Sequence, residues 1–570
     1  MLRRLRMICQ RVRLGGPVGA VVLLVFAGGA AVQADAAGKS PVSRSAITAQ
    51  AACTAGTTVQ SDTGPLCGVV QNGAVSYMGI PYAASPVGNL RWASPQPHAP
   101  WTTTFQATQA GPQCPQPGIP PAAPPANTNE NCLTLNVQGP AGADAATSAL
   151  PVIVDIHFGG FITDGALDGA ELAASGHAIV VSMNYRLGIL GFLALKALGP
   201  NAGDYGLQDQ YAALRWVKQN IAAFGGDPNN VTIEGSSAGG ASVCDALVSP
   251  AARGLFQHAI SESGFYNYNV NTIWWPADCK SQLQGEAQAQ REGAAFAAKV
   301  GCGSAANVVA CLRATPASTL IADAGQVEAP FAGGAIGPII NGTTLPVSPA
   351  NGFASGRFDH DASLIIGVAR DEFNGGVYND PVVANTPAQY QTLVTQQFGT
   401  EAPTVMARYP LQRFPDSSPF IAYRTIMADA FSVCPSLVAE RELARHIRVY
   451  AYEFDDANSL HPMDGYPLGS PHSAQAIYLF PSAYEPPLVQ FNLDQAPFED
   501  QLIAEWAGLA RTGNPTVSGT PYWPPFGSGG EEMVMSLVPA GDSAQTPVST
   551  ISLQHNCSFW AQVERQLGRG

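Results

Sequence analysis

Charged residues are scarce in this chain, and those present carry an excess of negative charge. Asp, Glu, Lys and Arg make up 12% of the 570 residues, with 28 Lys+Arg against 42 Asp+Glu. The net charge of −14 argues against nucleic acid or an anionic membrane as the main partner, because both demand a basic face. A hydrophobic content of 46% excludes an acidic disordered tail and allows a deep core.

Several sequence patterns are also missing. The 11 Cys include no C-x-x-C pair, and no Cys/His cluster has zinc spacing, so a metal site is not indicated. No internal repeat, heptad run or long charge block is present. Beyond the N-terminal segment there is no apolar run of about 20 residues, so we expect no membrane span in the rest of the chain.

The N-terminal segment has the pattern of a secretory signal peptide. Five arginines among the first 13 residues precede an apolar run centred on Val21–Phe26, and Val32–Ala34 offers small residues for cleavage. We therefore predict a signal peptide over residues 1–34 and a flexible leader over 35–52. A membrane anchor around Leu14–Val32 is the alternative. Cleavage would remove five arginines and no acidic residue, so the mature chain would be more acidic still.

Export of the protein would determine whether its cysteines form disulfides. Removal of Cys9 with the signal peptide leaves an even number, which in an oxidising compartment indicates disulfides. The protein is thus expected to be secreted, either extracellular or periplasmic. The remaining cysteines are Cys53, Cys67, Cys114, Cys132, Cys244, Cys279, Cys302, Cys311, Cys434 and Cys557.

Short apolar runs alternate with helical patterns along the mature chain. The runs predict buried strands, and their alternation with helices predicts an α/β fold with a mainly parallel sheet covered on both faces. The predicted strands are Leu150–Ile156, Ala178–Met183, Val231–Ile233, Ser363–Val368 and Val449–Phe454, and the clearest helices are Leu207–Phe224 and Ala238–Leu247.

A G-x-S-x-G motif occupies Gly235–Gly239, with Ser237 at its centre. A predicted strand precedes it and a predicted helix follows, which is the strand–turn–helix context that this motif requires. A serine held at such a turn can reach a carbonyl carbon, and the helix N-terminus favours developing negative charge. The pattern indicates Ser237 as a nucleophile; the alternative is a structural serine in a turn.

Two consecutive glycines, Gly159 and Gly160, follow another predicted strand. Without side chains, their backbone N–H groups can point into a cleft. Acyl transfer needs two or three such donors at the developing oxyanion, each worth about 3 kcal/mol. We expect Gly159, Gly160 and the N–H of Ala238 to form an oxyanion hole, rather than an ordinary glycine turn.

Eight further short motifs follow one another along the chain. They are Gly79–Ala83, Pro86–Trp92, Glu130–Val137, Asn184–Gly188, Gly203–Gln210, Phe224–Pro228, Arg511–Pro515 and Tyr522–Pro524. With the nucleophile motif, they resemble the type-B carboxylesterase/lipase family, which includes the cholinesterases, over nearly all of residues 60–562. The resemblance implies an α/β-hydrolase fold with large loop and helical insertions, forming a single domain over 53–562 before a C-terminal tail at 563–570. It implies no cofactor and no metal.

The resemblance also implies a Ser-Glu-His triad in that chain order. The acid matches Glu372, although Asp371 beside it is chemically eligible. Ser263 resembles a family serine that supports the acid. In such a triad, a neutral imidazole takes the serine proton while a carboxylate fixes its tautomer.

Four histidines follow the acid and are candidates for the base. His472 matches the family's histidine motif best, and His461 in the same loop is the alternative. His446 sits in a helical pattern and is expected at the surface. His555 lies too close to the C-terminus.

The family's disulfides suggest pairings for six of the ten cysteines. They correspond to Cys114–Cys132, Cys302–Cys311 and Cys434–Cys557. The simplest assignment of the rest pairs Cys53 with Cys67 and Cys244 with Cys279, the alternative being a buried free thiol at Cys244.

Departures from the family pattern narrow the range of expected substrates. Ser236 replaces the Glu that cholinesterases carry before the nucleophile. The loop 115–131 has no aromatic residue for cation–π capture of choline. Its six prolines cannot hold an amphipathic lid helix of the lipase kind. Phe158 replaces the first glycine of the family's oxyanion triplet and is expected to shape the acyl side of the substrate site. Gln475 stands where the family often has an acidic residue after the catalytic histidine.

These observations predict a secreted serine carboxylic-ester hydrolase that acts through an acyl-enzyme on small to medium soluble esters. Its partners would be the ester and water, without nucleic acid and without a membrane span after signal cleavage. A lipase or an aryl or hydroxycinnamoyl esterase is the nearer alternative. A non-catalytic extracellular binding protein on the same fold is the remote one.

Overall fold

The computed structural model describes most of the chain beyond its N-terminal region. Of the two units of the chain, Met1–Ile47 and Thr48–Gly570, only the second contains described residues. The described ranges are 52–118, 125–142, 148–200, 202–264, residue 279, 283–324, 337–374, 384–459, 468–481 and 491–568. The predicted signal peptide, nearly all of the leader, His461 and part of the proline-rich loop lie outside these ranges.

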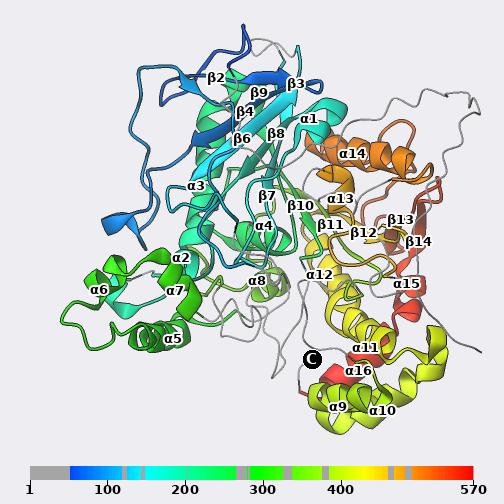
Figure 1. The fold of residues 1–570 in the computed structure, drawn as a ribbon. Coiled ribbons are helices and arrows are strands. Elements are labelled where there is room, and N and C mark those ends of the chain that lie inside the picture. Colours follow the sequence, from blue (N-terminus) through cyan, green and yellow to red (C-terminus); the bar gives the residue numbers. More distant parts are fainter. Residues whose placement is uncertain are drawn as a thin grey trace, which may run out of the picture. The chain divides into compact units, whose positions relative to one another are not determined.

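A large mixed sheet forms the centre of the described chain (Figure 1). Its middle strands, from β8 to β13, run parallel, and the strands at both edges run antiparallel. Its order is β14 (Ala544–Pro547), β13 (Met533–Leu537), β12 (Arg448–Phe454), β11 (Ser363–Ala369), β10 (His258–Glu262), β9 (Gly226–Ser236), β7 (Leu150–Ile156), β8 (Ile179–Met183), β6 (Thr134–Pro140), β4 (Ala74–Pro81) and β3 (Val69–Gln71). A small second sheet contains β1 (Val59–Gln60), β2 (Pro65–Cys67) and β5 (Phe105–Gln106).

Helices cover both faces of the large sheet. Those that pack on the strands from one side are α3 (Tyr205–Asn220), α4 (Ala238–Val248) and α12 (Cys434–Ala444), with α8 (Pro349–Ser355) against α4 and α12. On the other side lie α1 (Ala170–Gly176) and α14 (Gln495–Thr512), which contact each other, with α13 (Ala476–Leu479) against α14 (Figure 1). The predicted two-faced α/β arrangement is therefore present.

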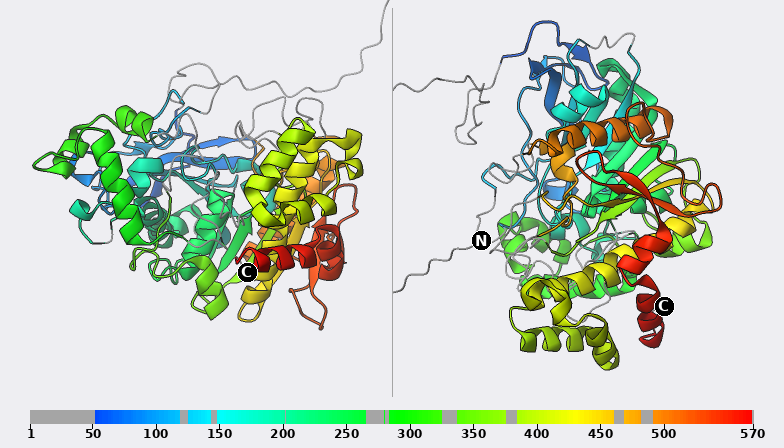
Figure 2. Two further views of the ribbon diagram at one scale, coloured as in Figure 1. Left: turned by 90° about the horizontal axis from the view of Figure 1, so that it is seen from below. Right: turned by 90° about the vertical axis from the view of Figure 1, so that its right-hand side faces the viewer.

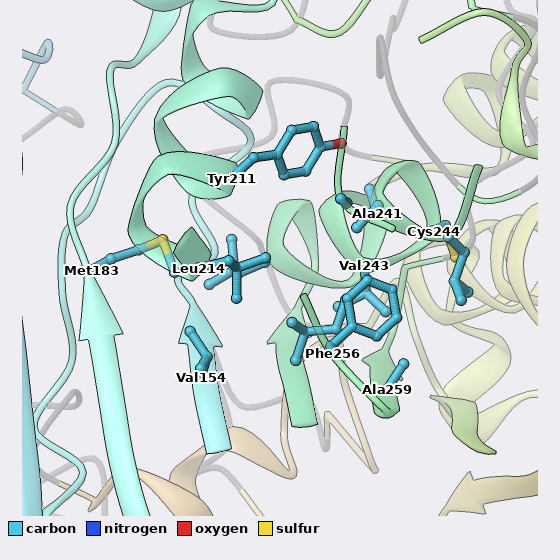
Figure 3. Close-up of a cluster of buried hydrophobic side chains, with 14 of the residues drawn as sticks. Val154, Met183, Tyr211, Leu214, Ala241, Val243, Cys244, Phe256 and Ala259 are labelled. Carbon is cyan, nitrogen blue, oxygen red and sulfur yellow. The ribbon is translucent and has the colours of Figure 1, made fainter. Parts of the chain in front are cut away.

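Alternate residues of each central strand face two different cores. Val152 and Val154 of β7 belong to a cluster with α3 and α4, whereas Ile153 between them belongs to a cluster with α1 and α14. Figure 3 shows part of the first core, in which Leu214 of α3 and Val243 of α4 gather with strand residues. Each fully buried aliphatic side chain contributes about 1.5–3 kcal/mol, which is why continuous apolar runs fold into central strands.

Two helical insertions follow the carboxyl ends of β10 and β11. After β10 come α5 (Glu286–Lys299), α6 (Val308–Ala314) and α7 (Ala317–Asp323), and α7 contacts α2 (Gly188–Phe192). After β11 come α9 (Pro387–Phe398), α10 (Ala402–Arg408), α11 (Pro419–Ala428) and a π-helical turn at Asp429–Val433. Parallel strands end at one edge of the sheet, so both insertions start at the edge where Ser237 and Glu372 lie.

Two helices end the described chain, and the second of them packs on the second insertion (Figure 2). They are α15 (Val548–Gln554) and α16 (Cys557–Gln566). Trp560 and Val563 of α16 share a core with Phe398 of α9 and are each 1% exposed. Helix α16 thus continues across the 562/563 boundary, so the first residues of the expected tail are helical and Val563 is packed.

Five disulfides link the cysteines of the described residues. They are Cys53–Cys67, Cys114–Cys132, Cys244–Cys279, Cys302–Cys311 and Cys434–Cys557. Cys244 of α4 is therefore bonded rather than a free thiol. None of the helices in the described ranges combines the length and hydropathy that a membrane crossing requires.

Candidate active site

Ser237 lies at the junction of β9 and α4 in a backbone conformation that residues with side chains rarely adopt. Its φ is 57° and its ψ is −120°. Two hydrogen bonds hold this turn: Ser237 N donates to Glu262 O of β10, and Ser237 O accepts from Ala241 N, each at 2.9 Å. The strand, sharp turn and helix expected around the motif are all present.

Gly239 allows the first turn of α4 to approach the end of β7. A Cβ at this position would lie 1.9 Å from the carbonyl oxygen of Ile156, a distance that no real contact allows. The close approach places Ala238 beside the segment that leaves β7 and leads to Gly159. The turn at Ser237 and the glycine pair are therefore neighbours in space.

The glycine pair itself adopts left-handed backbone angles. Gly159 has φ 100° and Gly160 has φ 63°, and a Cβ on Gly159 would lie 2.2 Å from the Thr163 carbonyl oxygen. The carbonyl of Gly159 accepts from Ile162 N and Thr163 N at 3.0 Å, which closes a tight turn. That Gly159, Gly160 and Ala238 donate to an oxyanion stays a prediction.

His157 and Tyr185 brace the segment between β7 and Gly159. The Tyr185 hydroxyl donates to His157 O at 3.0 Å, and the two rings stack with centroids 4.3 Å apart. His157 Nδ1 also lies 2.8 Å from Phe158 O. Burial lowers the pKa of His157 to about 4, so its imidazole is neutral at pH 7 and serves as packing for the glycine turn.

Glu372 and His472 meet as a buried pair. His472 Nδ1 is hydrogen-bonded to Glu372 Oε1, and the side chains are 5% and 0% exposed. A second bond joins the two backbones, since His472 N donates to Glu372 O at 3.1 Å. A carboxylate can only accept, so ionised Glu372 places the imidazole proton on Nδ1 and leaves Nε2 as the basic nitrogen.

The second oxygen of Glu372 is bound from two sides. Ser263 Oγ donates to Oε2 at 3.1 Å, and the backbone N–H of Ala369 donates to the same oxygen at 2.8 Å. Ser263 has φ 46° and is fully buried. The arrangement fixes the plane of the carboxylate toward His472.

Asp371, the alternative acid, is engaged elsewhere. Its Oδ2 pairs with Arg370 at 2.6 Å and accepts from Ser470 N at 3.0 Å. Its carboxylate is part of a partly exposed ion-pair group that includes Asp455. The structure therefore brings Glu372, and not Asp371, onto the imidazole of His472.

The other downstream histidines are placed away from this pair. His446 follows α12 and stacks on His360, with ring centroids 4.9 Å apart, on an exposed part of the surface. His555 is buried between Asp429 and Glu453. His461 lies outside the described residues.

One side-chain bond connects the turn at Ser237 with the turn that carries His472, called the histidine turn below. Ser236 Oγ donates to Ser473 Oγ at 2.8 Å, and both side chains are buried. Ser236 precedes Ser237 and Ser473 follows His472. The three predicted triad positions are thus gathered at the carboxyl edge of β9, β10 and β11.

Sequence reasoning missed a second bond to the histidine turn. Gln475 Nε2 donates to Glu262 Oε2 at 3.2 Å, and Trp506 Nε1 of α14 donates to Glu262 Oε1 at 2.7 Å. Glu262 directly precedes Ser263 at the end of a strand, and this position next to a predicted site residue is the sequence signal that could have indicated Glu262. Trp506 is 244 residues away in sequence, and no local pattern connects the two.

Glu262 of β10 has two acidic neighbours on the next two strands of the sheet, β9 and β7. Asp155 of β7 and Glu234 of β9 are register partners and share a hydrogen bond. Burial raises the pKa of both well above their ordinary values, and the surrounding carboxylates raise them further. Burial also raises the pKa of Glu262 to about 7, against the opposing effect of the Trp506 and Gln475 donors.

Within the described ranges, no three or more His, Cys, Asp or Glu side chains are grouped so that they could hold a metal ion.

The chain matches the carboxylesterase family model over residues 55–560. It is 31% identical over 508 residues to an acylcarnitine hydrolase of Rattus norvegicus, covering 83% of this chain and 85% of the relative. It is equally identical over 497 residues to a phenmedipham hydrolase of Pseudarthrobacter oxydans, covering 81% and 91%. A solved PNB esterase structure superposes with a TM-score of 0.71 at 28% identity, covering 88% of this chain and 99% of that one.

These matches confirm the predicted α/β-hydrolase fold, since the superposition covers most of the chain. They agree with the ordered motifs from Gly79 to Pro524. The chain therefore belongs to the carboxylesterase family and is a carboxylic-ester hydrolase.

Proposed function

We propose that the protein is a secreted serine carboxylesterase that hydrolyses small to medium soluble esters through an acyl-enzyme. The observation that carries this proposal is the buried His472–Glu372 pair, tied through Ser473 and Ser236 to the strained turn of Ser237. No cofactor takes part in the proposed reaction.

The first half of the reaction forms the acyl-enzyme. His472 Nε2 takes the proton of Ser237 Oγ while that oxygen bonds to the ester carbonyl carbon. The carbonyl electrons move to the oxygen, and the N–H groups of Gly159, Gly160 and Ala238 donate to it. When the carbonyl re-forms, the ester C–O bond breaks and His472 returns its proton to the leaving alcohol.

The second half repeats these steps with water. Water gives a proton to His472 and bonds to the acyl carbon, and the carboxylic acid leaves as Ser237 regains its proton. Glu372 acts throughout by holding Nδ1–H of His472 and stabilising the imidazolium. Ser263 and Ala369 keep that carboxylate in place.

The alcohol side of the substrate is expected to be uncharged. Ser236 supplies no carboxylate beside the nucleophile, and the loop 115–131 offers no aromatic ring for a quaternary amine. The relatives are named for different substrates, among them acylcarnitine, phenmedipham, a pyrethroid and cocaine. Their names therefore do not select one ester.

Replacement of the nucleophile tests the proposal. Ser237→Ala should lower kcat for p-nitrophenyl acetate by at least about 1,000-fold with unchanged melting temperature. An organophosphonate should label the wild type at Ser237 and leave the variant unlabelled. Normal hydrolysis by the variant would refute the assignment, and a folded wild type without an adduct would favour a binding protein.

An acyl-chain series separates an esterase from its nearest rivals. We expect short soluble p-nitrophenyl esters to be hydrolysed best, with no jump in rate when the substrate exceeds its solubility. A rate jump at that point would indicate a lipase. Preference for methyl ferulate over aliphatic esters of similar size would indicate a hydroxycinnamoyl esterase.

Secretion is supported by the basic and apolar N-terminal pattern and by the disulfides. Five disulfides favour an oxidising compartment. Expression of the full chain should release a mature protein that begins near Asp35 and contains no titratable thiol. Retention of the full-length chain in the membrane fraction would favour the anchor alternative.

A further inference from the structure

The turn that carries His472 is fastened to the ends of two neighbouring strands. Ser236, the last residue of β9, bonds Ser473 at 2.8 Å, and Glu262, the last residue of β10, accepts from Gln475 at 3.2 Å. Ser236 and Glu262 are register partners. The two bonds therefore start side by side on the sheet and end one and three residues after His472.

Both bonds are shielded from water. Glu262 and Gln475 are 0% exposed, and Ser236 and Ser473 are 4% and 8% exposed. When one partner of a buried hydrogen bond is removed, the other is left desolvated without compensation. The bonds thus oppose movement of the histidine turn away from the strands.

Local backbone preference does not explain the conformation of this turn. Ser473 has φ 58°, a left-handed angle that a serine adopts only at a cost. The bond between Ser236 and the side chain of Ser473 supplies an external restraint at that residue. A turn in this state needs such restraints to keep His472 in one place.

Glu262 is itself held by a residue of α14. Trp506 of α14 is fully buried and donates its ring N–H to Glu262 Oε1 at 2.7 Å. Its ring also packs on Tyr452 of β12, with centroids 5.8 Å apart. The carboxyl group that receives Gln475 is therefore fixed in space.

The amide at position 475 suits its surroundings. Glu262 of β10 already has two acidic neighbours on the next two strands of the sheet, Glu234 of β9 and Asp155 of β7. A carboxylate at 475 would add a fourth acid to this buried group, and like charges in low dielectric repel strongly. Gln475 offers an N–H donor without added charge, which gives a physical reason for the departure from the family pattern.

We propose that Ser236 and Gln475 are positioning residues for His472, acting through Ser473 and Glu262 as two parallel restraints on the histidine turn. This inference rests on the proposed function, in which His472 is the base. The restraints hold Nε2 of His472 in line with Ser237 Oγ.

Replacement of the serine restraint is the first test. Ser236→Ala should lower kcat by about 10-fold or more, because small misplacement of a catalytic group is costly, while KM stays within about twofold. The matched control is Ser536→Ala, which removes a 2.8 Å serine–threonine bond between β13 and β14 at the far edge of the sheet. The control should keep full kcat.

The glutamine restraint is tested with a graded set of variants. Gln475→Leu and Glu262→Leu should each lower kcat by about 10-fold or more, since each loses the bond. Glu262→Gln should restore most of the activity, because its amide can accept from Trp506 and donate to the carbonyl of Gln475. This rescue also keeps the test valid if Glu262→Leu fails to fold.

The rate of organophosphonate labelling reports on the activation of Ser237 without substrate binding. It should fall in parallel with kcat in Ser236→Ala and Gln475→Leu. Labelling and kcat at wild-type rates in these variants, or a rise in KM alone, would overturn the positioning role. That result is distinct from failure of the proposed function, in which the wild type itself would not be labelled at Ser237.

Discussion

Two buried histidine–carboxylate pairs within the described residues look alike in their local chemistry but differ in what the second imidazole nitrogen contacts. At the candidate site, His472 Nδ1 is bonded to Glu372. Near the C-terminus, His555 Nδ1 is bonded to Asp429 at 2.6 Å, and its Nε2 lies 3.0 Å from Glu453 as an ion pair. A histidine with an acid on each nitrogen is held as a cation, and cannot accept a proton from a nucleophile.

The surroundings of the two pairs reinforce this contrast. Glu372 is oriented by Ser263 and a backbone N–H at the edge of the sheet where Ser237 lies. Asp429 also accepts from the Tyr409 hydroxyl at 2.6 Å, which in turn accepts from Trp560 of α16. The second network thus joins the C-terminal helix to the insertion after β11, and its role is stability. A histidine–acid pair indicates catalysis only when the remaining nitrogen faces a nucleophile.

Parallel replacement of the two histidines should give opposite results. His472→Ala is expected to lower kcat by about 1,000-fold or more with little change in melting temperature. His555→Ala should keep kcat within a few-fold but lower the melting temperature, because it leaves two buried acids without their cation. Ester hydrolysis and thermal unfolding measure the two effects, and a loss of kcat confined to His555→Ala would reverse the assignment.

Replacement of the neighbouring carboxylates Asp371 and Glu372 should also have different effects on kcat. Glu372→Gln removes the acceptor for Nδ1–H and should lower kcat by about 100-fold or more. Asp371→Asn leaves the histidine pair intact, since Asp371 bonds Arg370 and Ser470, and should cost less than about fivefold. If Asp371→Asn were the more damaging change in steady-state kinetics, the acid would have to be reassigned.

The His555 network predicts a pH-dependent contribution to stability. Burial alone would lower the pKa of His555, but Asp429 and Glu453 outweigh it and raise the pKa to about 10. The folded state thus binds a proton that the unfolded state releases near pH 6.5. The contribution is complete below pH 6.5 and is lost as the pH approaches 10.

The difference in melting temperature between wild type and His555→Gln should therefore be larger at pH 6 than at pH 9.5. Thermal unfolding at the two values measures it, with His446→Gln as the control at an exposed histidine. An unchanged difference across this range would mean that His555 is not a cation in the folded protein.

Glu262 supplies the smallest expected effect, and its contribution to stability changes with pH in the same direction as that of His555. Its pKa is raised to about 7 by burial, so the folded state favours the protonated acid. Its contribution to stability is greatest below the ordinary pKa of Glu and declines as the pH rises to 7. Glu262→Gln should therefore be more stable relative to wild type at pH 8 than at pH 5, as measured by urea unfolding at both values.

Much of the fold could be predicted because buried parallel strands appear in the sequence as short continuous apolar runs. Leu150–Ile156 was predicted as a strand and is β7 with the same bounds. The strand at Val231–Ile233 extends in fact over Gly226–Ser236. Its polar ends, Asp227–Asn230 and Glu234–Ser236, interrupt the apolar run. Pairing with β10 makes Glu234–Ser236 part of the strand, whereas Asp227–Asn230 lie between the Leu150–Gly226 and Val152–Val231 pairs with β7, where the register shifts. Such pairing is not visible locally.

Parts of the candidate site could be predicted for a similar reason. The G-x-S-x-G motif and the glycine pair are short and depend on backbone sterics, which act within a few residues of Ser237 and Gly159. The choice of Glu372 and His472 relied on the family resemblance. The bonds from Ser236 to Ser473 and from Glu262 to Gln475 span 237 and 213 residues, and no sequence period connects such partners.

The sequence by itself determined the class of fold and the turn at Ser237, because these follow from hydrophobic patterning and from glycines at positions that exclude a Cβ. The family followed from the resemblance of the ordered motifs. Only the tertiary structure decided which acid faces His472, which histidine is instead a buried cation, and what Gln475 contacts. Those outcomes depend on which side chains meet across separate strands. Burial then sets their charge, since a carboxyl or imidazole removed from water titrates according to its neighbours.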